Sequence, residues 1–151
     1  MIKWTLGPNL HFNCVEEFGL SQKFILIKLK DLKEKINDLN KVEPNFQQLS
    51  IADRKGVLNA IIVTQKVNFD VESVHFYSRV FAPWIGVDED PVCGSAHTQL
   101  APFWSQKLSI NGILVGQQCS KRGGITNCFI RGDRVELSGS AAIMFGGHFH
   151  L

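Results

Sequence analysis

The chain of 151 residues carries 16 Lys and Arg against 14 Asp and Glu, a formal net charge of +2, and 44% of it is hydrophobic. This length suits one domain with its own core, and the balanced charge gives no electrostatic reason to expect nucleic acid or a membrane surface as a partner. No apolar run approaches the roughly 20 residues of a membrane span. No signal peptide follows Met1, so we expect a cytoplasmic location.

The first half of the chain alternates extended segments with short helical ones. Apolar residues recur at helical spacing after Asp31, while runs rich in β-branched residues favour strands. The predicted elements are an irregular start or inter-domain remnant over 1–22, a strand over 23–29, a helix from Asp31 to Asn40, a helical turn within 45–52, and strands over 56–64 and 71–81. The domain proper is expected to span 23–151.

The second half predicts one helix and then only strands and turns. The helix runs from Ala96 to Lys107, and Leu100, Phe103 and Trp104 form its core-facing stripe. Strands are predicted over 114–120, 125–131, 135–138 and 142–149, with a hairpin turn at Gly132-Asp133. Together these elements predict an α+β domain: an antiparallel, barrel-like sheet wrapped around one central helix.

The four cysteines have no pairing that indicates zinc or a disulfide framework, since no C-x-x-C motif is present. Cys14, Cys119 and Cys128 lie in apolar or strand-like sequence and are expected to be small core residues. Cys93 differs, because a thiol at a helix N-terminus is a common way to obtain a reactive thiolate.

Residues 88–97 read Asp-Glu-Asp-Pro-Val-Cys-Gly-Ser-Ala-His and lead directly into the predicted helix. Pro91 fixes the backbone at the entry, and Gly94 lets the chain approach a ligand closely. The free N–H groups of the first turn and the helix dipole favour a bound carboxylate or phosphate. Asp90 and Cys93 stand beside this position with groups able to move a proton. The alternative is an ordinary N-cap, since Asp and Ser are frequent caps.

Two stretches carry a family resemblance. Residues 77–97 read YSRxFAPWxGxxEDPVCGSAH, and residues 118–124 read QCSxRGG. In this order and spacing they resemble the phenazine-biosynthesis-like (PhzF) isomerase family, which shares the diaminopimelate epimerase fold. The resemblance extends from about Lys23 to the end of the chain. It implies that the chain is the C-terminal one of two similar halves, each a barrel-like sheet around a helix, with the active site in the cleft between them.

The resemblance also implies a chemistry and a site. Reactions on this fold move a proton on and off carbon without a cofactor, and no metal is expected. Asp90 and Ser95 match motif residues that line the substrate site, while Gly94 and Ala96 supply N–H groups that hold a substrate carboxylate. The candidate catalytic residues are therefore Asp90 and Cys93, and the candidate substrate-binding residues are Gly94, Ser95, Ala96 and His97.

The chain departs from the family pattern in two ways. A full member is roughly twice as long, and no stretch of residues 1–60 resembles the part that carries the family's acid/base glutamate. Cys93 stands where the family usually has threonine. It either resembles the acid/base cysteine of related cofactor-independent epimerases or is a small-residue replacement of similar volume.

Five side chains have two interpretations each. His97 lies close enough to the pocket to donate a hydrogen bond, or it is a structural helix residue. His148 and His150 share a strand face, which suits a metal but also a surface pair without a third ligand. Arg79 and Arg122 are candidates for steering an anionic substrate, although the second lies in a turn that suits a solvated hairpin tip.

Two functional hypotheses follow. The first is an isomerase-type protein for a small carboxylate, whose cleft is completed by another chain or by a homodimer. The second is a non-catalytic ligand-binding or protein-interaction module that keeps the fold without the acid/base glutamate. Proton exchange at the α-carbon of a substrate analogue would separate them.

Overall fold

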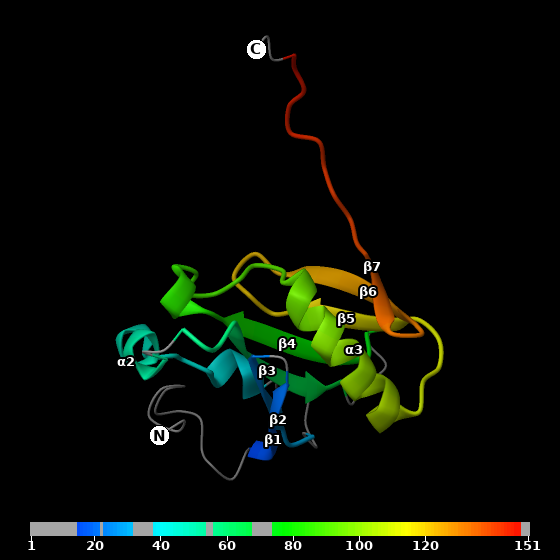
Figure 1. Ribbon diagram of the computed structural model, residues 1–151. Helices are drawn as coiled ribbons and strands as arrows, with labels where there is room; N and C mark the ends of the chain where they lie inside the picture. Colours follow the sequence, from blue (N-terminus) through cyan, green and yellow to red (C-terminus); the bar gives the residue numbers. More distant parts are fainter. Residues whose placement is uncertain (1–14, 22, 32–37, 54–55, 68–73, 149–151) are drawn as a thin grey trace.

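One seven-stranded sheet runs through the described part of the chain, and its strands follow sequence order from edge to edge (Figure 1). The computed structural model describes residues 15–21, 23–31, 38–53, 56–67 and 74–148. The strands are β1 (Val15–Ser21), β2 (Phe24–Leu29), β3 (Ala60–Lys66), β4 (Phe76–Phe81), β5 (Leu114–Gln118), β6 (Gly124–Arg131) and β7 (Arg134–Ser138). The helices are the 3-10 turns η2 (Asp38–Lys41) and η3 (Pro83–Ile85) and the α-helices α2 (Phe46–Ala52) and α3 (Gly94–Leu108).

The α+β class is confirmed, but two details of the predicted sheet are not. β2 pairs with β3, and β4 with β5, in parallel, so the sheet is mixed rather than antiparallel. Both parallel pairs are joined by crossovers that contain a helix, α2 in the first and α3 in the second, which is the usual requirement for a parallel connection. The expected barrel is not confirmed, because the sheet is open and has β1 and β7 at its edges.

Some of the observed helices and strands match those predicted from the sequence, and others do not. The strand at 23–29, the helical turn at 45–52 and the hairpin turn between β6 and β7 are confirmed. Residues 15–21, expected to be irregular, instead form β1 against β2. The helix predicted after Asp31 falls largely on 32–37, outside the described residues.

The prediction of a strand over 142–149 is wrong for residues 142–148, the part of this range that the structure describes. Gly139–His148 has no regular secondary structure and leads away from the body of the protein (Figure 1). An apolar run forms a strand only where a neighbouring strand completes the hydrogen bonds, and no described residue pairs with this segment. We call it the C-terminal tail.

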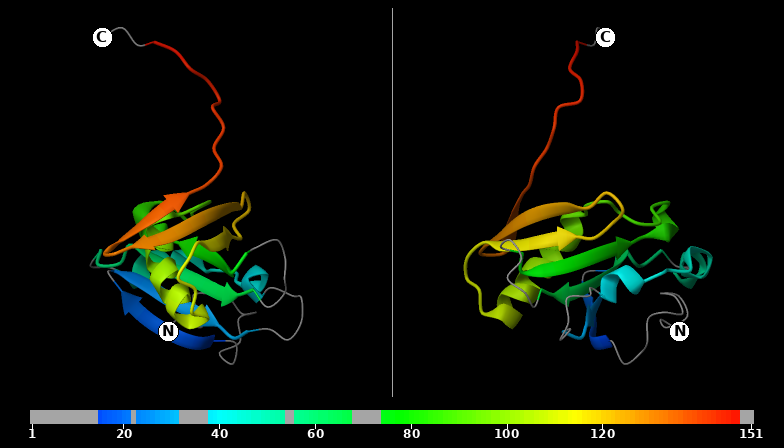
Figure 2. Two further views of the ribbon diagram at one scale, coloured as in Figure 1. Left: turned by 90° about the vertical axis from the view of Figure 1, so that its right-hand side faces the viewer. Right: turned by 180° about the vertical axis from the view of Figure 1, so that it is seen from behind.

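Helical segments cover both faces of the sheet (Figure 2). On one face, Trp104 and Leu100 of α3 pack against Phe76 of β4, and the Trp104 and Phe76 rings stack with centroids 5.8 Å apart. On the other face, Leu39 and Leu49 pack against residues of β2, β3 and β4. Central strands buried on both faces are apolar almost throughout, as Phe-Ile-Leu-Ile-Lys-Leu of β2 is. No helix in the described ranges is long and apolar enough to cross a membrane.

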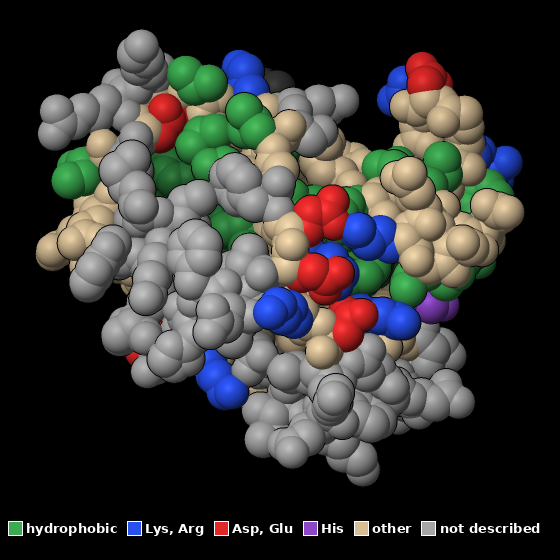
Figure 3. Space-filling model, turned by 90° about the horizontal axis from the view of Figure 1, so that it is seen from below, with side chains coloured by type: hydrophobic (Ala, Val, Ile, Leu, Met, Phe, Trp, Pro, Cys, Tyr) green, Lys and Arg blue, Asp and Glu red, His purple; other side chains and the backbone are tan. Residues whose placement is uncertain are grey.

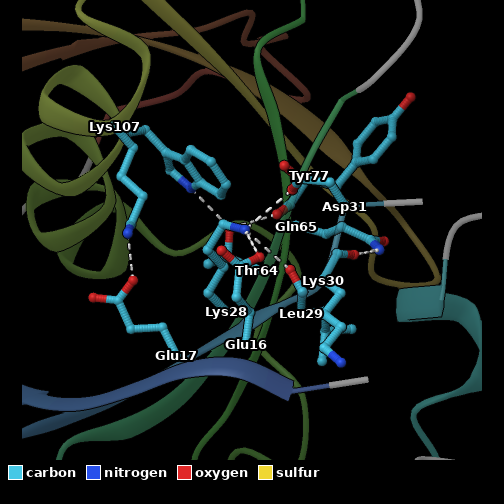
Figure 4. Close-up of polar contacts among 11 residues, drawn as sticks. Glu16, Glu17, Lys28, Leu29, Lys30, Asp31, Thr64, Gln65, Tyr77 and Lys107 are labelled. Carbon is cyan, nitrogen blue, oxygen red and sulfur yellow. Dashed lines mark hydrogen bonds and ion pairs between the residues drawn. The ribbon is translucent and has the colours of Figure 1, made fainter. Parts of the chain in front are cut away.

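Charged groups attach β1 to the rest of the fold. The Lys28 side chain is only 3% exposed, and its ammonium forms ion pairs with Glu16 of β1 and with Asp31 (Figure 4). Lys107 of α3 pairs with Glu17, the next residue of β1. Acidic and basic side chains accordingly lie next to one another on the underside of the molecule (Figure 3). A buried ammonium is tolerated because carboxylates compensate its lost hydration.

The contact between β5 and the core leaves no room for a side chain at Gly116. A Cβ atom there would lie 2.4 Å from the Phe76 ring, whereas one at Gly112 would meet nothing within 4 Å. We expect Gly116→Ala to lower the free energy of unfolding by about 1–3 kcal/mol through overpacking. Urea denaturation measures this, with Gly112→Ala as the matched control. Equal stabilities of the two variants would contradict the packing described here.

Candidate functional site

Helix α3 begins at Gly94, two residues earlier than predicted, and Cys93 is its N-cap in an extended conformation (φ −99°, ψ 105°). The Cys93 side chain makes no capping hydrogen bond. The helix start therefore lacks the Asp or Ser cap that the simpler interpretation of this stretch required. In an α-helix the first-turn N–H groups have no partner within the helix, so those of α3 are suited to an anion.

The loop before α3 is held on β5 by one buried side chain. Gln118, at 0% exposure, accepts a hydrogen bond from the Cys93 N–H through Oε1 (2.9 Å) and donates from Nε2 to the Asp90 carbonyl. The Asp90 N–H in turn donates to the Val80 carbonyl of β4 at 3.0 Å. Both ends of the Asp90–Cys93 segment are thus fixed to adjacent strands. The sequence placed Gln118 in a motif but assigned it no role.

The second motif packs against the first. Ser120 Oγ donates to the Pro91 carbonyl (2.7 Å) and accepts from the Gly123 N–H (2.9 Å). Gly123 has φ +69°, a conformation that favours glycine. A Cβ atom at Gly124 would lie 2.5 Å from a methyl group of Val92. The glycine pair of the second motif therefore lets its turn close directly on the loop of the first.

The proton-moving candidates lie together at the start of α3. Cys93 Sγ is 3.3 Å from Ser95 Oγ, and the Asp90 carboxyl contacts the same thiol. Burial raises the pKa of the Cys93 thiol above its ordinary value, and the nearby Ser95 hydroxyl and Ala96 backbone offset this only in part. The thiolate expected from a helix N-terminus is therefore not favoured, because Cys93 as a residue is only 9% exposed. This supports the small-residue interpretation of Cys93.

His97 does not face the pocket. Its side chain is fully buried, and Nδ1 lies 2.7 Å from the Cys93 carbonyl one turn earlier. Since a carbonyl only accepts, Nδ1 carries the proton, and burial lowers the pKa of the ring. The expectation that His97 donates a hydrogen bond to a ligand is replaced by a structural role. The Ala96 side chain is also buried, so only its backbone belongs to the helix start.

Arg79 is bound within the fold and is not placed to steer a substrate. Its guanidinium makes a two-point ion pair with Glu89 (2.7 and 3.0 Å), and Nη1 donates to the carbonyls of Leu39 (2.9 Å) and Val42 (2.6 Å). It ties the motif loop to the segment around η2. Arg122, in contrast, is exposed.

The remaining cysteines and histidines form no metal site among the residues described. No group of three His, Cys, Asp or Glu side chains there could hold an ion, while Cys14 and His150 lie outside the described ranges. Cys128 is confirmed as a core residue, and burial raises the pKa of its thiol to about 11. Cys119 is only half-buried.

A cavity of about 780 Å³ adjoins the start of α3. Its lining comes from the loop, the second motif, β7 and the root of the tail: Val92, Gly94, 122–126 and 137–142. Of the six predicted site residues, Gly94 lines this cavity and Ser95 follows it at the exposed start of the helix. Arg122 adds a cation to the rim. The arrangement is a positively polarised hollow that suits a small anion.

The chain belongs to the phenazine biosynthesis-like protein family, whose model matches residues 12–147. It is 38% identical to phenazine biosynthesis-like domain-containing protein 2 of Mus musculus, covering 97% of this chain and 51% of the relative. It is 40% identical to an uncharacterised isomerase of Pseudomonas aeruginosa, covering 82% of this chain and 44% of that one.

Solved structures agree with the sequence comparisons. A phenazine biosynthesis protein of the PhzF family from Enterococcus faecalis superposes with a TM-score of 0.76 at 31% identity, covering 99% of this chain and 51% of that chain. A phenazine biosynthesis PhzC/PhzF protein from Clostridium difficile superposes with a TM-score of 0.68 at 30% identity, covering 87% and 46%. The chain spans about half the length of the relatives that it matches.

Gln118 provides a test of how the loop is held. We expect Gln118→Leu to cost about 2 kcal/mol or more of folding stability, because it leaves two buried backbone groups of the loop without partners. Gln117→Leu, one residue earlier and on the other face of β5, is the matched control. Urea denaturation measures the free energy of unfolding of both variants. A Gln118→Leu protein as stable as the Gln117→Leu control would contradict the role of Gln118 in holding the loop.

The raised pKa of Cys93 predicts its reactivity. At neutral pH the thiol is less ionised than an ordinary cysteine, so alkylation by iodoacetamide should reach its midpoint at a higher pH in the folded protein than in urea. Mass spectrometry of the Cys93 peptide follows the modification, with Cys93→Ser identifying the signal. A midpoint lower in the folded protein than in urea would restore the acid/base interpretation of Cys93.

Proposed function

We propose that this chain is the anion-binding half of a cofactor-independent isomerase that acts on a small carboxylate. The observation that supports this most is the start of α3: an uncapped first turn beside a cavity lined by Gly94 and by the turn of the second motif. Relatives named as isomerases support the reaction class.

The substrate carboxylate would lie over the first turn of α3. The N–H groups of Gly94 and Ser95 and the Ser95 hydroxyl would donate to it, and Arg122 on the cavity rim would add a positive charge. Because Gln118 holds the loop before α3, these donors are already in position and need no reorganisation as negative charge develops. An array that stabilises the carboxylate also lowers the free energy of a carbanion on the adjacent carbon.

Asp90 is the candidate acid/base group contributed by this half. Its carboxyl lies beside the Cys93 thiol and is half-buried. Its backbone is fixed at both sides through Val80 and Gln118, so the side chain has a defined position. A second acid/base group, which proton transfer to the opposite face of a carbon requires, would come from outside this chain. Since the chain spans about half the length of its relatives, their other half is the natural source.

The competing function is a binding module without catalysis, and the half-length match to the relatives favours it if no second half joins the site. The two proposals differ in one measurement. A complete isomerase site exchanges the α-proton of a carboxylate substrate analogue with deuterium from D2O, whereas a binding module holds the analogue without exchange.

Ser95 is the most direct test of the anion site. We expect Ser95→Ala to weaken the binding of acetate, benzoate and L-aspartate by roughly ten-fold or more, because a hydrogen bond to a charged group contributes about 1.5–3 kcal/mol. Isothermal titration calorimetry with these three probes measures the change.

The control for this experiment is Ser50→Ala. Ser50 is an exposed serine on α2 whose hydroxyl donates only to the Phe46 carbonyl, so its loss should leave carboxylate affinity unchanged. Equal affinities in the Ser95→Ala and wild-type proteins would contradict the proposed site.

A further inference from the structure

The short connection between α3 and β5 loops out at one side of the molecule (Figure 1). At its start, Ile110 packs against the core, its N–H donates to the Ser105 carbonyl (3.1 Å), and its own carbonyl accepts from Ser105 Oγ (2.7 Å). At its end, Leu114 is fully buried. Between these anchors Asn111 and Gly112 are exposed, and neither belongs to a helix or a strand. The ends of the connection are therefore held, while water reaches the pair between them.

The Asn111-Gly112 pair is not held by contacts of its own. Among the described residues, no hydrogen bond involves the Asn111 side chain or the Gly112 N–H. A Cβ atom added at Gly112 would meet nothing within 4 Å, so no other part of the described chain crowds this backbone. Gly112 also has no side chain to cover its own amide nitrogen. The Gly112 nitrogen and the Asn111 side-chain amide can therefore approach each other without displacing another residue.

Two groups placed in this way can react within the chain. The Gly112 amide nitrogen attacks Cγ of Asn111, and a new carbon–nitrogen bond closes a cyclic imide. The side-chain carbon–nitrogen bond of Asn111 breaks, and its amide group leaves as ammonia together with the proton that the Gly112 nitrogen gives up. Water then opens the imide at either carbonyl. Opening at Cγ yields aspartate, whereas opening at the backbone carbonyl yields isoaspartate, in which the main chain runs through Cβ and Cγ.

We propose that Asn111 is a site of spontaneous modification, at which the folded chain converts asparagine into aspartate and isoaspartate with water as the co-reactant. The reaction replaces a neutral side chain with a carboxylate, so each modified copy has a formal net charge lower by one than the original +2. The isoaspartate product also lengthens the backbone just before β5. The inference does not depend on the proposed function, since Asn111 and Gly112 do not line the cavity at the start of α3.

The other described asparagines are not arranged for this reaction. No other asparagine of the sequence precedes a glycine, so each following nitrogen is crowded by a side chain. Each of those described is also tied into the fold. Asn40 lies in η2, Asn45 caps α2 with its side chain, the Asn59 N–H donates to the Lys23 carbonyl, and Asn127 lies in β6 between two paired strands. We therefore expect Asn111 to be modified before any of these four.

Incubation of the folded chain in water enriched in heavy oxygen, followed by peptide mass spectrometry, tests the proposal. The peptide with Asn111 should change from amide to acid and take up one heavy oxygen atom, while the peptides with Asn59 and Asn127 stay amides. The rate should lie close to that of a synthetic peptide of residues 109–114, because the fold does not protect the pair. A folded chain that reacts about ten-fold more slowly than this peptide, a barrier higher by roughly 1.4 kcal/mol, would overturn the proposal. So would earlier modification of another described asparagine.

Gly112→Ala tests the role of the uncovered backbone nitrogen. The added methyl group meets no other described residue, so the fold is kept, but it crowds the attacking nitrogen. We expect this variant to modify Asn111 more slowly by roughly ten-fold or more. Gly146→Ala is the matched control, since a Cβ there also meets nothing within 4 Å, and it should react at the wild-type rate. Equal rates in the two variants would show that the Gly112 nitrogen does not attack Asn111.

Discussion

The side-chain amide of Gln118 is the interaction on which the candidate site depends. It satisfies the Cys93 N–H and the Asp90 carbonyl at once, and it is fully buried at the end of β5. Cys93 is thereby held extended, so that α3 starts at Gly94 without a capping side chain. A buried amide with both of its groups paired is a rigid support. The position of the helix start is therefore fixed by a strand of the sheet and not by the backbone of the loop alone.

Much of the fold could be predicted from local patterns, but the neighbours of each strand could not. The alternation and β-branched content of 23–29 or 125–131 describe a strand without naming its partner. Whether β4 pairs with β5 in parallel is decided by the helix that crosses between them. The C-terminal tail illustrates the same point. Its sequence is typical of a strand, but no strand among the described residues pairs with it.

The residues of the site were easier to predict than their orientation. The sequence placed Asp90, Cys93 and Ser95 at one helix start, and the structure brings their side chains into contact. The sequence could not show that the His97 side chain turns inward to the Cys93 carbonyl. Helical periodicity alone does not fix which face of the helix start is covered by the rest of the protein. Gln118 was missed because its role rests on contacts 25 and 28 residues away. The available signal was a polar residue on the same face of the strand as Leu114 and Gly116, which are buried.

The central claim is that the first turn of α3 and the turn of the second motif form one anion site. Chemical-shift mapping of the backbone amides of the 15N-labelled protein, titrated with benzoate, tests it most directly. The account predicts that the largest shifts occur at Gly94, Ser95 and residues 122–126, which lie together only in the folded protein. Shifts confined to other parts of the chain, with these amides unmoved at saturation, would contradict it.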